Sequence, residues 1–326
     1  MADRGLVILG CGWIALRHAA AARRLGLPVI FASRDPDRAR AYARRFGGVA
    51  AHGSYEAALA DPRAAGAIIC TPHGHHLAHA RMAFAAGKHV LVEKPIARTL
   101  DEADELIAAA EAARRVVMVA EQFHFMPAFR RLKALLEGGA LGELREIHLV
   151  ARGFHNRSGW RLQADLAGGG ALIDGGIHYV HALRWWGGGV RRVFALRPPP
   201  TFASFPGEDA VSLLAELPGG GVGFLSNSLA APGLPKFQWS TVTGSRATCF
   251  ADNRGRWIAL RGGRRFRLWL TWRDTRGYRA MLACFAEAMA RGKAEEMDGA
   301  AGRADLAVVV AAYRSLAERR PIELAC

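Results

Sequence analysis

Short apolar runs alternate with longer segments of helical periodicity through the first 120 residues. The apolar runs predict strands at residues 6–9, 29–32, 67–70, 89–92 and 116–120. Helices are predicted between them at residues 15–25, 36–46 and 77–86 and, behind a capping box of Thr99 with Glu102, at 99–114. Strands that alternate with helices in this way are typical of β-α units around a parallel sheet.

The pattern changes after about residue 143, where extended runs follow one another with few helices between them. These runs predict strands at residues 143–150, 192–196, 210–217, 222–229, 237–242, 247–250, 257–260 and 266–270. Glycine-rich turns separate several of them, which favours an antiparallel sheet. Helices are expected at residues 171–186, 278–290 and 302–317. The chain is therefore predicted to be an α/β protein of two domains, residues 1–122 and 123–326, with the terminal helix as a candidate to pack back on the first domain.

The composition is that of an ordinary globular chain, with 51% of its 326 residues hydrophobic and 22% charged. No apolar run approaches the roughly 18 residues needed to span a membrane, and no long apolar segment with a cleavage site follows the amino-terminus. The five cysteines are odd in number and never form a C-x-x-C pair, so they indicate neither a disulfide framework nor a zinc site. We expect a cytoplasmic protein with no membrane partner.

The net charge is unusual, because 44 Lys and Arg against 29 Asp and Glu give +15. Such an excess can attract nucleic acid or an anionic substrate by long-range steering. The cations are nearly all arginine and are scattered through an Ala- and Gly-rich chain, as a codon bias toward GC-rich triplets would produce. No block of five or six like charges and no basic run with interleaved aromatics is present, so we expect no nucleic-acid partner.

A glycine loop, G-C-G-W-I-A at residues 10–15, connects the first predicted strand to the first predicted helix. That context is what the dinucleotide-binding fingerprint requires. Gly10 permits the tight turn, and Gly12 lets the backbone approach a pyrophosphate that then lies on free N–H groups at the helix N-terminus. Gly10, Gly12, Trp13 and Ile14 are the expected contacts.

The end of the second strand normally carries a carboxylate that binds the ribose hydroxyls of NAD. Here a small hydroxyl and a guanidinium, Ser33 and Arg34, stand at the strand tip, and Arg38 follows one helical turn later. Arginine can grip a 2′-phosphate bidentately, so NADP(H) is favoured. The alternative is that Asp35 binds the diol and Arg34 points to solvent, which leaves NAD(H) open.

Three further polar stretches interrupt apolar surroundings: residues 71–76 (T-P-H-G-H-H), 93–95 (E-K-P) and 168–178 (G-G-G-A-L-I-D-G-G-I-H). The first two leave the carboxyl ends of predicted parallel strands, where open α/β sheets bind ligands. Asp174 and His178 are four residues apart, which places them on one helical face. Further cofactor contacts are expected from Thr71, Pro72, His73, His76, Glu93, Lys94 and Gln122.

In this order, the motifs resemble the family of glucose–fructose oxidoreductase, inositol dehydrogenase and MocA-type oxidoreductases. The resemblance covers nearly the whole chain and includes A-G-K-H-V-L-V-E-K-P at residues 86–95 and A-Y-R-S-L at 312–316. It implies an N-terminal Rossmann dinucleotide-binding domain and a C-terminal α/β domain with a large, mostly antiparallel open sheet. It also implies a homodimer or homotetramer built through that sheet.

The resemblance implies hydride transfer between a secondary alcohol, typically on a sugar or cyclitol ring, and nicotinamide C4. His178 would exchange the hydroxyl proton, Asp174 would orient its imidazole, and Lys94 would donate to the reacting oxygen. Pro95 resembles the family's cis-proline. The implied activity is an NADP(H)-dependent interconversion of alcohol and ketone on a sugar, cyclitol or nucleotide-linked sugar.

The substrate pocket is expected to use Gln122, His124, His155, Trp160, Arg161 and His181. Two of these positions depart from the family pattern, since His124 stands where Arg is frequent and His181 where Asp is frequent, so no particular sugar follows. Several histidines cluster at residues 73–79, but no carboxylate or cysteine completes a metal site, and none is expected. Two alternatives stay open: a non-catalytic dinucleotide-binding regulator, and a reductase of a trans-dihydrodiol, an imine or a tetrapyrrole.

Overall fold

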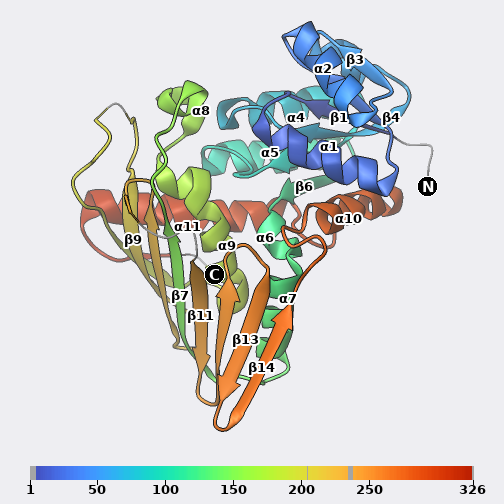
Figure 1. The fold of residues 1–326 in the computed structure, drawn as a ribbon. Helices are drawn as coiled ribbons and strands as arrows, with labels where there is room; N and C mark the ends of the chain where they lie inside the picture. The colour runs from blue at the N-terminus through green and yellow to red at the C-terminus, as the bar shows by residue number, and fades with distance from the viewer. Residues whose placement is uncertain (1–4, 204, 234–237, 325–326) are drawn as a thin grey trace. The chain divides into compact units, whose positions relative to one another are not determined.

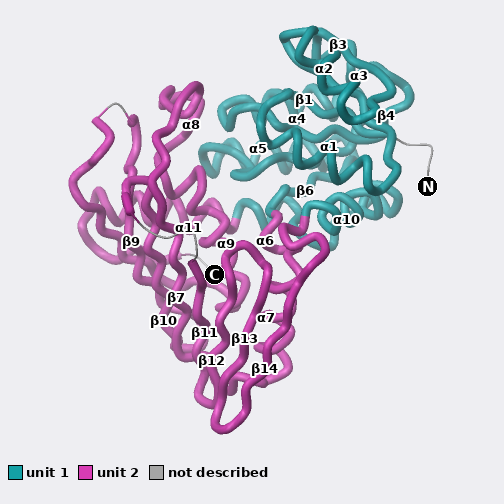
Figure 2. The backbone as a smooth tube through the Cα atoms, in the orientation of Figure 1, with its two compact units in different colours: residues 1–121, 278–303 teal, residues 122–277, 304–326 magenta. Residues whose placement is uncertain are grey.

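The computed structural model describes residues 5–203, 205–233 and 238–324 (Figure 1). The chain folds into two compact units (Figure 2). Unit 1 contains residues 1–121 and 278–303, and unit 2 contains residues 122–277 and 304–326. Residues 278–303, which the sequence pattern assigned to the second domain, therefore group with the first.

Unit 1 is built on a six-stranded parallel sheet with the order β3-β2-β1-β4-β5-β6. Its strands are β1 (Gly5–Leu9), β2 (Val29–Ala32), β3 (Ala50–His52), β4 (Ala64–Ile69), β5 (His89–Glu93) and β6 (Val117–Ala120). Every residue of β1, β2, β5 and β6 is buried, which explains their continuous apolar runs. The predicted parallel sheet is confirmed. The sequence pattern missed β3, whose three residues form no apolar run.

Helices flank the sheet of unit 1. They are α1 (Trp13–Leu25), α2 (Pro36–Phe46), α3 (Tyr55–Leu59), a 3₁₀ turn (His73–His75), α4 (His76–Ala85), α5 (Leu100–Ala112) and α10 (Tyr278–Arg291). Thr99 caps α5 as predicted, because its hydroxyl accepts from Glu102 N–H at 3.2 Å. The Glu102 carboxylate accepts from the N–H of Arg98, one residue before the position that a capping box uses. Helix α10 packs against α1 and so belongs to the core of unit 1.

Unit 2 contains a nine-stranded sheet with the order β14-β13-β12-β11-β7-β10-β9-β8-β15. Its strands are β7 (Leu144–Arg152), β8 (Arg192–Leu196), β9 (Ala210–Glu216), β10 (Val222–Ser228), β11 (Trp239–Gly244), β12 (Thr248–Asp252), β13 (Trp257–Gly262), β14 (Arg265–Leu270) and β15 (Ile322–Glu323). Only the pair of β7 and β10 is parallel among these described strands. The mostly antiparallel sheet is confirmed, and the predicted strand start at residue 237 lies outside the described residues.

The helices of unit 2 cover one face of this sheet. They are α6 (Gln122–Phe125), α7 (Pro127–Glu137), a 3₁₀ turn (Gly159–Leu162), α8 (Ala164–Ala167), a π-helical turn (Leu172–Gly176), α9 (Ile177–Gly187) and α11 (Gly299–Glu318), whose first residues belong to unit 1. Side chains on β9 alternate, with Val211 and Leu213 buried and Ser212 and Leu214 exposed. The sheet therefore has one covered face and one open face.

Among the residues that the structure describes, no helix combines the length and the hydropathy that a membrane span requires.

Candidate active site

The glycine loop of unit 1 has the geometry that a pyrophosphate requires. Gly10 has φ +93°, a region that favours glycine, and Gly12 is the N-cap of α1. A Cβ atom added at Gly12 would meet nothing within 4 Å, so the backbone there is open to a ligand. No side chain caps the helix, and its first turn contains no acidic residue. The free N–H groups of the first turn therefore fit an anionic dinucleotide.

The expected contacts Trp13 and Ile14 lie in that first turn. Trp13 is 66% exposed, and the guanidinium of Arg17 lies over its ring at 5.1 Å from the centroid. Ile14 is half-buried. Both side chains start where α1 leaves the loop, so they flank the open backbone of Gly12.

The tip of β2 carries the residues that would distinguish NADP from NAD. Ser33 is buried, and its hydroxyl accepts from Asp35 N–H at 3.2 Å. Asp35 is the N-cap of α2, since its Oδ1 accepts from the N–H groups of Asp37 and Arg38 at 3.0 and 3.1 Å. Arg34 and Arg38 are exposed, and neither has a carboxylate partner among the described residues. The carboxylate is thus committed to the helix, while two guanidinium groups remain available.

The loops after β4 and β5 are tied together by His76. Its buried ring lies between the carbonyl oxygens of Pro95, 2.9 Å from Nδ1, and Thr71, 3.1 Å from Nε2. Burial lowers the pKa of His76. The expected cis bond is present between Lys94 and Pro95. The His76 ring therefore links the backbones of the two loops.

The remaining predicted cofactor residues of unit 1 follow the same two strands. His73 is buried and its ring packs edge-on against that of His76 at 5.6 Å. Pro72 and Lys94 are half-buried. Glu93 is buried and bonds His18 on α1, with 2.7 Å between Oε1 and Nε2. Sequence reasoning missed His18, because a single histidine within an Ala-rich helix gives no signal.

His178 lies at the start of α9 in unit 2, in contact with α6. The ring of Phe123 stacks on the His178 ring, with 4.9 Å between the ring centroids and 17° between the ring planes. The amide nitrogen of Gln122 is 3.4 Å from His178 Nε2. The residue before α9 belongs to a π-helical turn, which contains Asp174. Turns of this kind occur frequently at functional sites. The predicted helix at 171–186 is thus α-helical only from Ile177.

Asp174 is buried between two arginines. Its Oδ2 accepts from Arg157 Nη2 at 2.9 Å and from Arg161 Nε at 2.9 Å. Arg161 in turn lies over the ring of Trp160 at 4.4 Å. The structure therefore joins three of the predicted site residues in one cluster, and Arg157 was missed. The predicted orientation of His178 by Asp174 stays a prediction.

His124 and His181 belong to a second polar cluster of unit 2. His124 Nδ1 is 3.2 Å from His181 Nε2, and His181 Nδ1 is 2.9 Å from Asp305 Oδ2. Arg184 Nε donates to the other Asp305 oxygen at 2.7 Å. His181 is only 1% exposed, so its burial favours a positioning role over the predicted direct contact with substrate. Asp305 and Arg184 were not predicted, because the bonds that join Asp305 to His181 and to Arg184 each span more than 120 residues.

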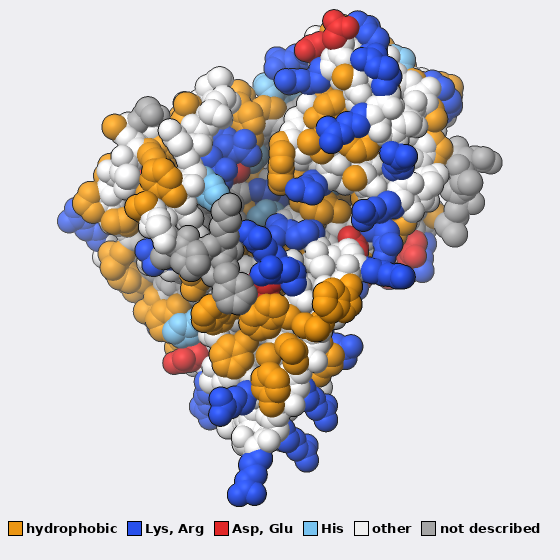
Figure 3. Space-filling model, viewed as in Figure 1, with side chains coloured by type: hydrophobic (Ala, Val, Ile, Leu, Met, Phe, Trp, Pro, Cys, Tyr) orange, Lys and Arg blue, Asp and Glu red, His pale blue; other side chains and the backbone are white. Residues whose placement is uncertain are grey.

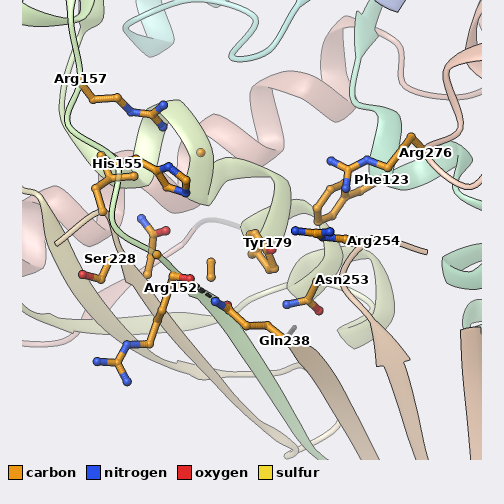
Figure 4. A pocket seen from close by; sticks show the side chains of 15 residues that line it. Phe123, Arg152, His155, Arg157, Tyr179, Ser228, Gln238, Asn253, Arg254 and Arg276 are labelled. Carbon is orange, nitrogen blue, oxygen red and sulfur yellow. Dashed lines mark hydrogen bonds between the residues drawn. The ribbon is translucent and has the colours of Figure 1, made fainter. Parts of the chain in front are cut away.

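A pocket of about 260 Å³ opens beside His178 within unit 2 (Figure 4). Phe123, Tyr179 and the predicted His155 line it. Burial raises the pKa of Tyr179 to about 12, so its phenol stays neutral. Sequence reasoning missed most of this wall, which comes from loops after β7 and β12 and before α10.

The predicted residues therefore fall into two groups. Lys94 and the cofactor residues up to Glu93 belong to unit 1, whereas Asp174, His178 and all the substrate candidates belong to unit 2. The convergence of Lys94 with His178 stays a prediction. Within the described residues, no cluster of three or more His, Cys, Asp or Glu side chains could hold a metal ion.

The parallel sheet with its open glycine loop defines unit 1 as a dinucleotide-binding Rossmann unit. Residues 4–121 match the family model described as the oxidoreductase family with an NAD-binding Rossmann fold, and residues 129–249 match the GFO/IDH/MocA C-terminal domain. The chain belongs to the GFO/IDH/MocA oxidoreductase family, as the sequence motifs predicted.

Two curated relatives are similar over part of the chain. A trans-1,2-dihydrobenzene-1,2-diol dehydrogenase of Mus musculus is 32% identical over 212 residues, 62% of this chain and 60% of that protein. A 1-carboxy-3-chloro-3,4-dihydroxycyclohexa-1,5-diene dehydrogenase of Comamonas testosteroni is 34% identical over 153 residues, 46% of this chain and 38% of that protein. The matches thus span well under two thirds of these relatives' own length. The solved structure of a levoglucosan dehydrogenase in complex with NADH superimposes with a TM-score of 0.88 at 23% identity, covering 99% of each chain, which shows a common fold.

Proposed function

We propose that this protein is an NADP(H)-dependent oxidoreductase that interconverts a secondary alcohol and a ketone on a ring, carried by a sugar, a cyclitol or a nucleotide-linked sugar. The observation that carries the proposal is the glycine loop. Its backbone is open at Gly12, no side chain caps the N-terminus of α1, and the first turn of that helix contains no acidic residue. An anionic dinucleotide is the ligand that such a site suits. When bound, its nicotinamide accepts or returns a hydride at C4.

Side chains of this protein would transfer the hydroxyl proton and stabilise the negative charge that develops on the reacting oxygen. In oxidation, the hydroxyl proton passes to His178, while the hydrogen on the same carbon leaves as hydride with both electrons of its C–H bond, and the C=O bond forms. Lys94 donates a hydrogen bond to the same oxygen and stabilises its alkoxide character. Phe123 and Gln122 hold the His178 ring from α6, so the base is fixed before substrate arrives. Reduction runs through the same groups in reverse.

The preference for NADP(H) rests on Arg34 and Arg38. Both are exposed beside the β2 tip, where the carboxylate of Asp35 already caps α2. The levoglucosan dehydrogenase structure contains NADH, so NAD(H) is the competing cofactor. A 2′-phosphate would meet two cations here, whereas a ribose diol would compete for a carboxylate whose Oδ1 already accepts from two N–H groups of α2.

The dihydrodiol dehydrogenases among the relatives favour a second candidate substrate, a cyclic vicinal diol without a sugar framework. Such a diol carries the same ring secondary alcohol, so the roles of His178 and Lys94 would not change. The two candidates therefore differ in the substrate and not in the chemistry.

We also propose that the open sheet face of unit 2 joins copies of this chain. Large apolar side chains are exposed there, including Leu214 (44%), Phe224 (38%) and Leu268 (50%). Figure 3, in the orientation of Figure 1, shows apolar side chains gathered over β11, β13 and β14. Exposed apolar surface of this kind marks interaction sites. The proposed state is a homodimer or homotetramer in the cytoplasm.

The test is a spectrophotometric screen for reduction of NADP⁺ and NAD⁺ at 340 nm against sugars, inositols and cyclic diols. Lys94→Ala and His178→Ala should each lower kcat by about 10²- to 10⁴-fold, the usual contribution of acid–base groups. Lys293→Ala, at an exposed lysine of unit 1, is the matched control and should change nothing. Turnover within about threefold of wild type in both site variants would refute the assigned roles.

A further inference from the structure

The pocket beside His178 is rich in cations and lacks carboxylates. None of its fifteen lining residues is Asp or Glu, while four are arginines: Arg152, Arg157, Arg254 and Arg276. Figure 4 shows Arg152 directed away from the centre, which leaves three guanidinium groups and the ring of His155 around the opening. The charge of this wall is therefore positive.

Two of these arginines form no ion pair within the part of the chain that the structure describes. Arg254 and Arg276 are exposed, and neither forms an ion pair with any described carboxylate. Arg256 provides the contrast two residues away, because its Nε donates to Asp252 at 2.7 Å. Arg157 shares Asp174 with Arg161, so two guanidinium groups there are balanced by one carboxylate. The excess positive charge is local to the pocket and is not a property of every arginine in this region.

Two neutral polar side chains of the wall already form hydrogen bonds within the protein. Asn253 accepts from Ser240 at 2.7 Å and donates to the Val150 carbonyl at 2.6 Å. Gln238 bonds both backbone groups of Arg152. Two donors of lining residues, Arg157 Nε and Asn227 Nδ2, are buried without an acceptor among the described residues. The wall therefore offers more donors than acceptors, which suits an acceptor-rich ligand.

The pocket and the proposed base share a wall. Phe123 lines the pocket and its ring stacks on His178, and Tyr179, which also lines the pocket, follows His178 in the chain. In Figure 4, Arg254 and Arg276 lie on the Phe123 side, with His155 and Arg157 opposite. A ligand group held by these arginines would thus place the rest of its ring near His178.

We propose that this pocket binds an anionic group on the substrate, a carboxylate or a phosphate ester, and that Arg254 and Arg276 are the residues that grip it. Guanidinium groups bind either anion in a bidentate manner. The inference rests on the proposed function, and it narrows the substrate from a neutral polyol to an acidic one. Arg254 and Arg276 determine specificity and take no part in hydride or proton transfer.

The experiment measures binding to the NADP⁺-saturated protein by isothermal titration. Ligands come in matched sets: an aldose, its uronic acid and its 6-phosphate, for the glucose, galactose and mannose series. We expect one acidic member to bind at least about tenfold more tightly than its neutral parent. Preference for the uronic acid identifies a carboxylate site, and preference for the 6-phosphate identifies a phosphate site.

Variants test whether the preference for an acidic ligand arises from this pocket. Arg254→Ala and Arg276→Ala should each weaken the acidic ligand about tenfold and leave the neutral sugar unchanged, while Arg254→Lys should retain part of the affinity. Arg264→Ala, at an exposed arginine in the turn between β13 and β14, is the matched control and should bind like wild type. Thermal melting verifies that each variant is folded.

The outcomes separate this inference from the proposed function. Equal binding of acidic and neutral ligands, no binding of any acid, or an acid preference that survives both alanine substitutions overturns the inference. Cofactor reduction with neutral polyols alone also overturns it, although the proposed function then stands. Arginine-dependent binding of an acid without cofactor reduction by any ligand supports the anion site and overturns the proposed function.

Discussion

Replacing Arg34 tests the cofactor assignment at a single exposed side chain. Arg34 leaves the tip of β2, has no carboxylate partner among the described residues and is not part of the core. Arg34→Ala therefore removes one cation from the expected 2′-phosphate site without disturbing the fold. Arg38 remains one helical turn away, so the single variant should retain part of the preference for NADP(H).

The magnitude follows from the two guanidinium groups. A hydrogen bond to a charged group contributes about 1.5–3 kcal/mol, and the exposure of both arginines places this site at the low end. About 1.4 kcal/mol corresponds to a factor of ten in affinity. We expect about a tenfold weaker Kd for NADPH in Arg34→Ala, and about a hundredfold weaker Kd when Arg38→Ala is added. The Kd for NADH should change less than threefold, because it carries no 2′-phosphate.

The assay is a titration of protein with NADPH and with NADH, followed by nicotinamide fluorescence at 50 and 300 mM salt. Arg44→Ala, at an exposed arginine in the last turn of α2, is the control for loss of general positive charge. The reasoning would be refuted by equal weakening of both cofactors, or by an NADPH affinity that the double variant leaves within threefold of wild type.

Three other predictions concern the interior and the base. His178→Gln should lower kcat at least about 100-fold and abolish the acidic limb of the pH–rate profile, whereas an unchanged profile would exclude His178 as the base. Asp305→Ala should lower the free energy of unfolding by about 3 kcal/mol in urea, because it leaves Arg184 without its buried acceptor; a loss below about 1 kcal/mol would contradict this account. The pKa of His79 is lowered to about 4, mainly because the ring is buried and to a smaller extent because neighbouring cationic groups repel its charged form. The unfolded chain therefore takes up this proton first as the pH falls below about 6.5, and stability is lost toward pH 4. The free energy of unfolding should fall between pH 7 and pH 5 by about 1–2 kcal/mol less in His79→Gln than in wild type. Urea unfolding at both pH values measures this difference, and an equal loss in the two proteins would contradict the prediction.

The local pattern was sufficient for most of the regular structure. The strand β2 and the helix α2 coincide with their predicted ranges, since each combines a continuous apolar run or a 3.6-residue period with clear end signals. The same pattern missed β3, which is short and only half-buried, and α7, whose proline start follows directly on another short helix. Residues 278–303 could not be assigned from sequence, because their place beside α1 depends on long-range packing.

The candidate site was predictable where a motif is continuous in sequence. The glycine loop, the cis bond before Pro95 and the position of His178 on a helix fall in this class. The pocket was not predictable beyond His155, because its arginines come from segments far apart in the chain and no local motif distinguishes them from the other arginines. The π-helical turn was also missed, since four-residue spacing alone cannot distinguish it from a regular helix.

The most direct measurement follows a labelled hydrogen from the substrate to the cofactor. A polyol that is active in the screen would be prepared with deuterium on the reacting carbon and incubated with NADP⁺ and the protein. The account predicts one deuterium at C4 of the NADPH formed, detected by NMR, and the same label, formed more slowly, in His178→Ala. Reduced cofactor that carries only solvent hydrogen at C4 would contradict direct hydride transfer.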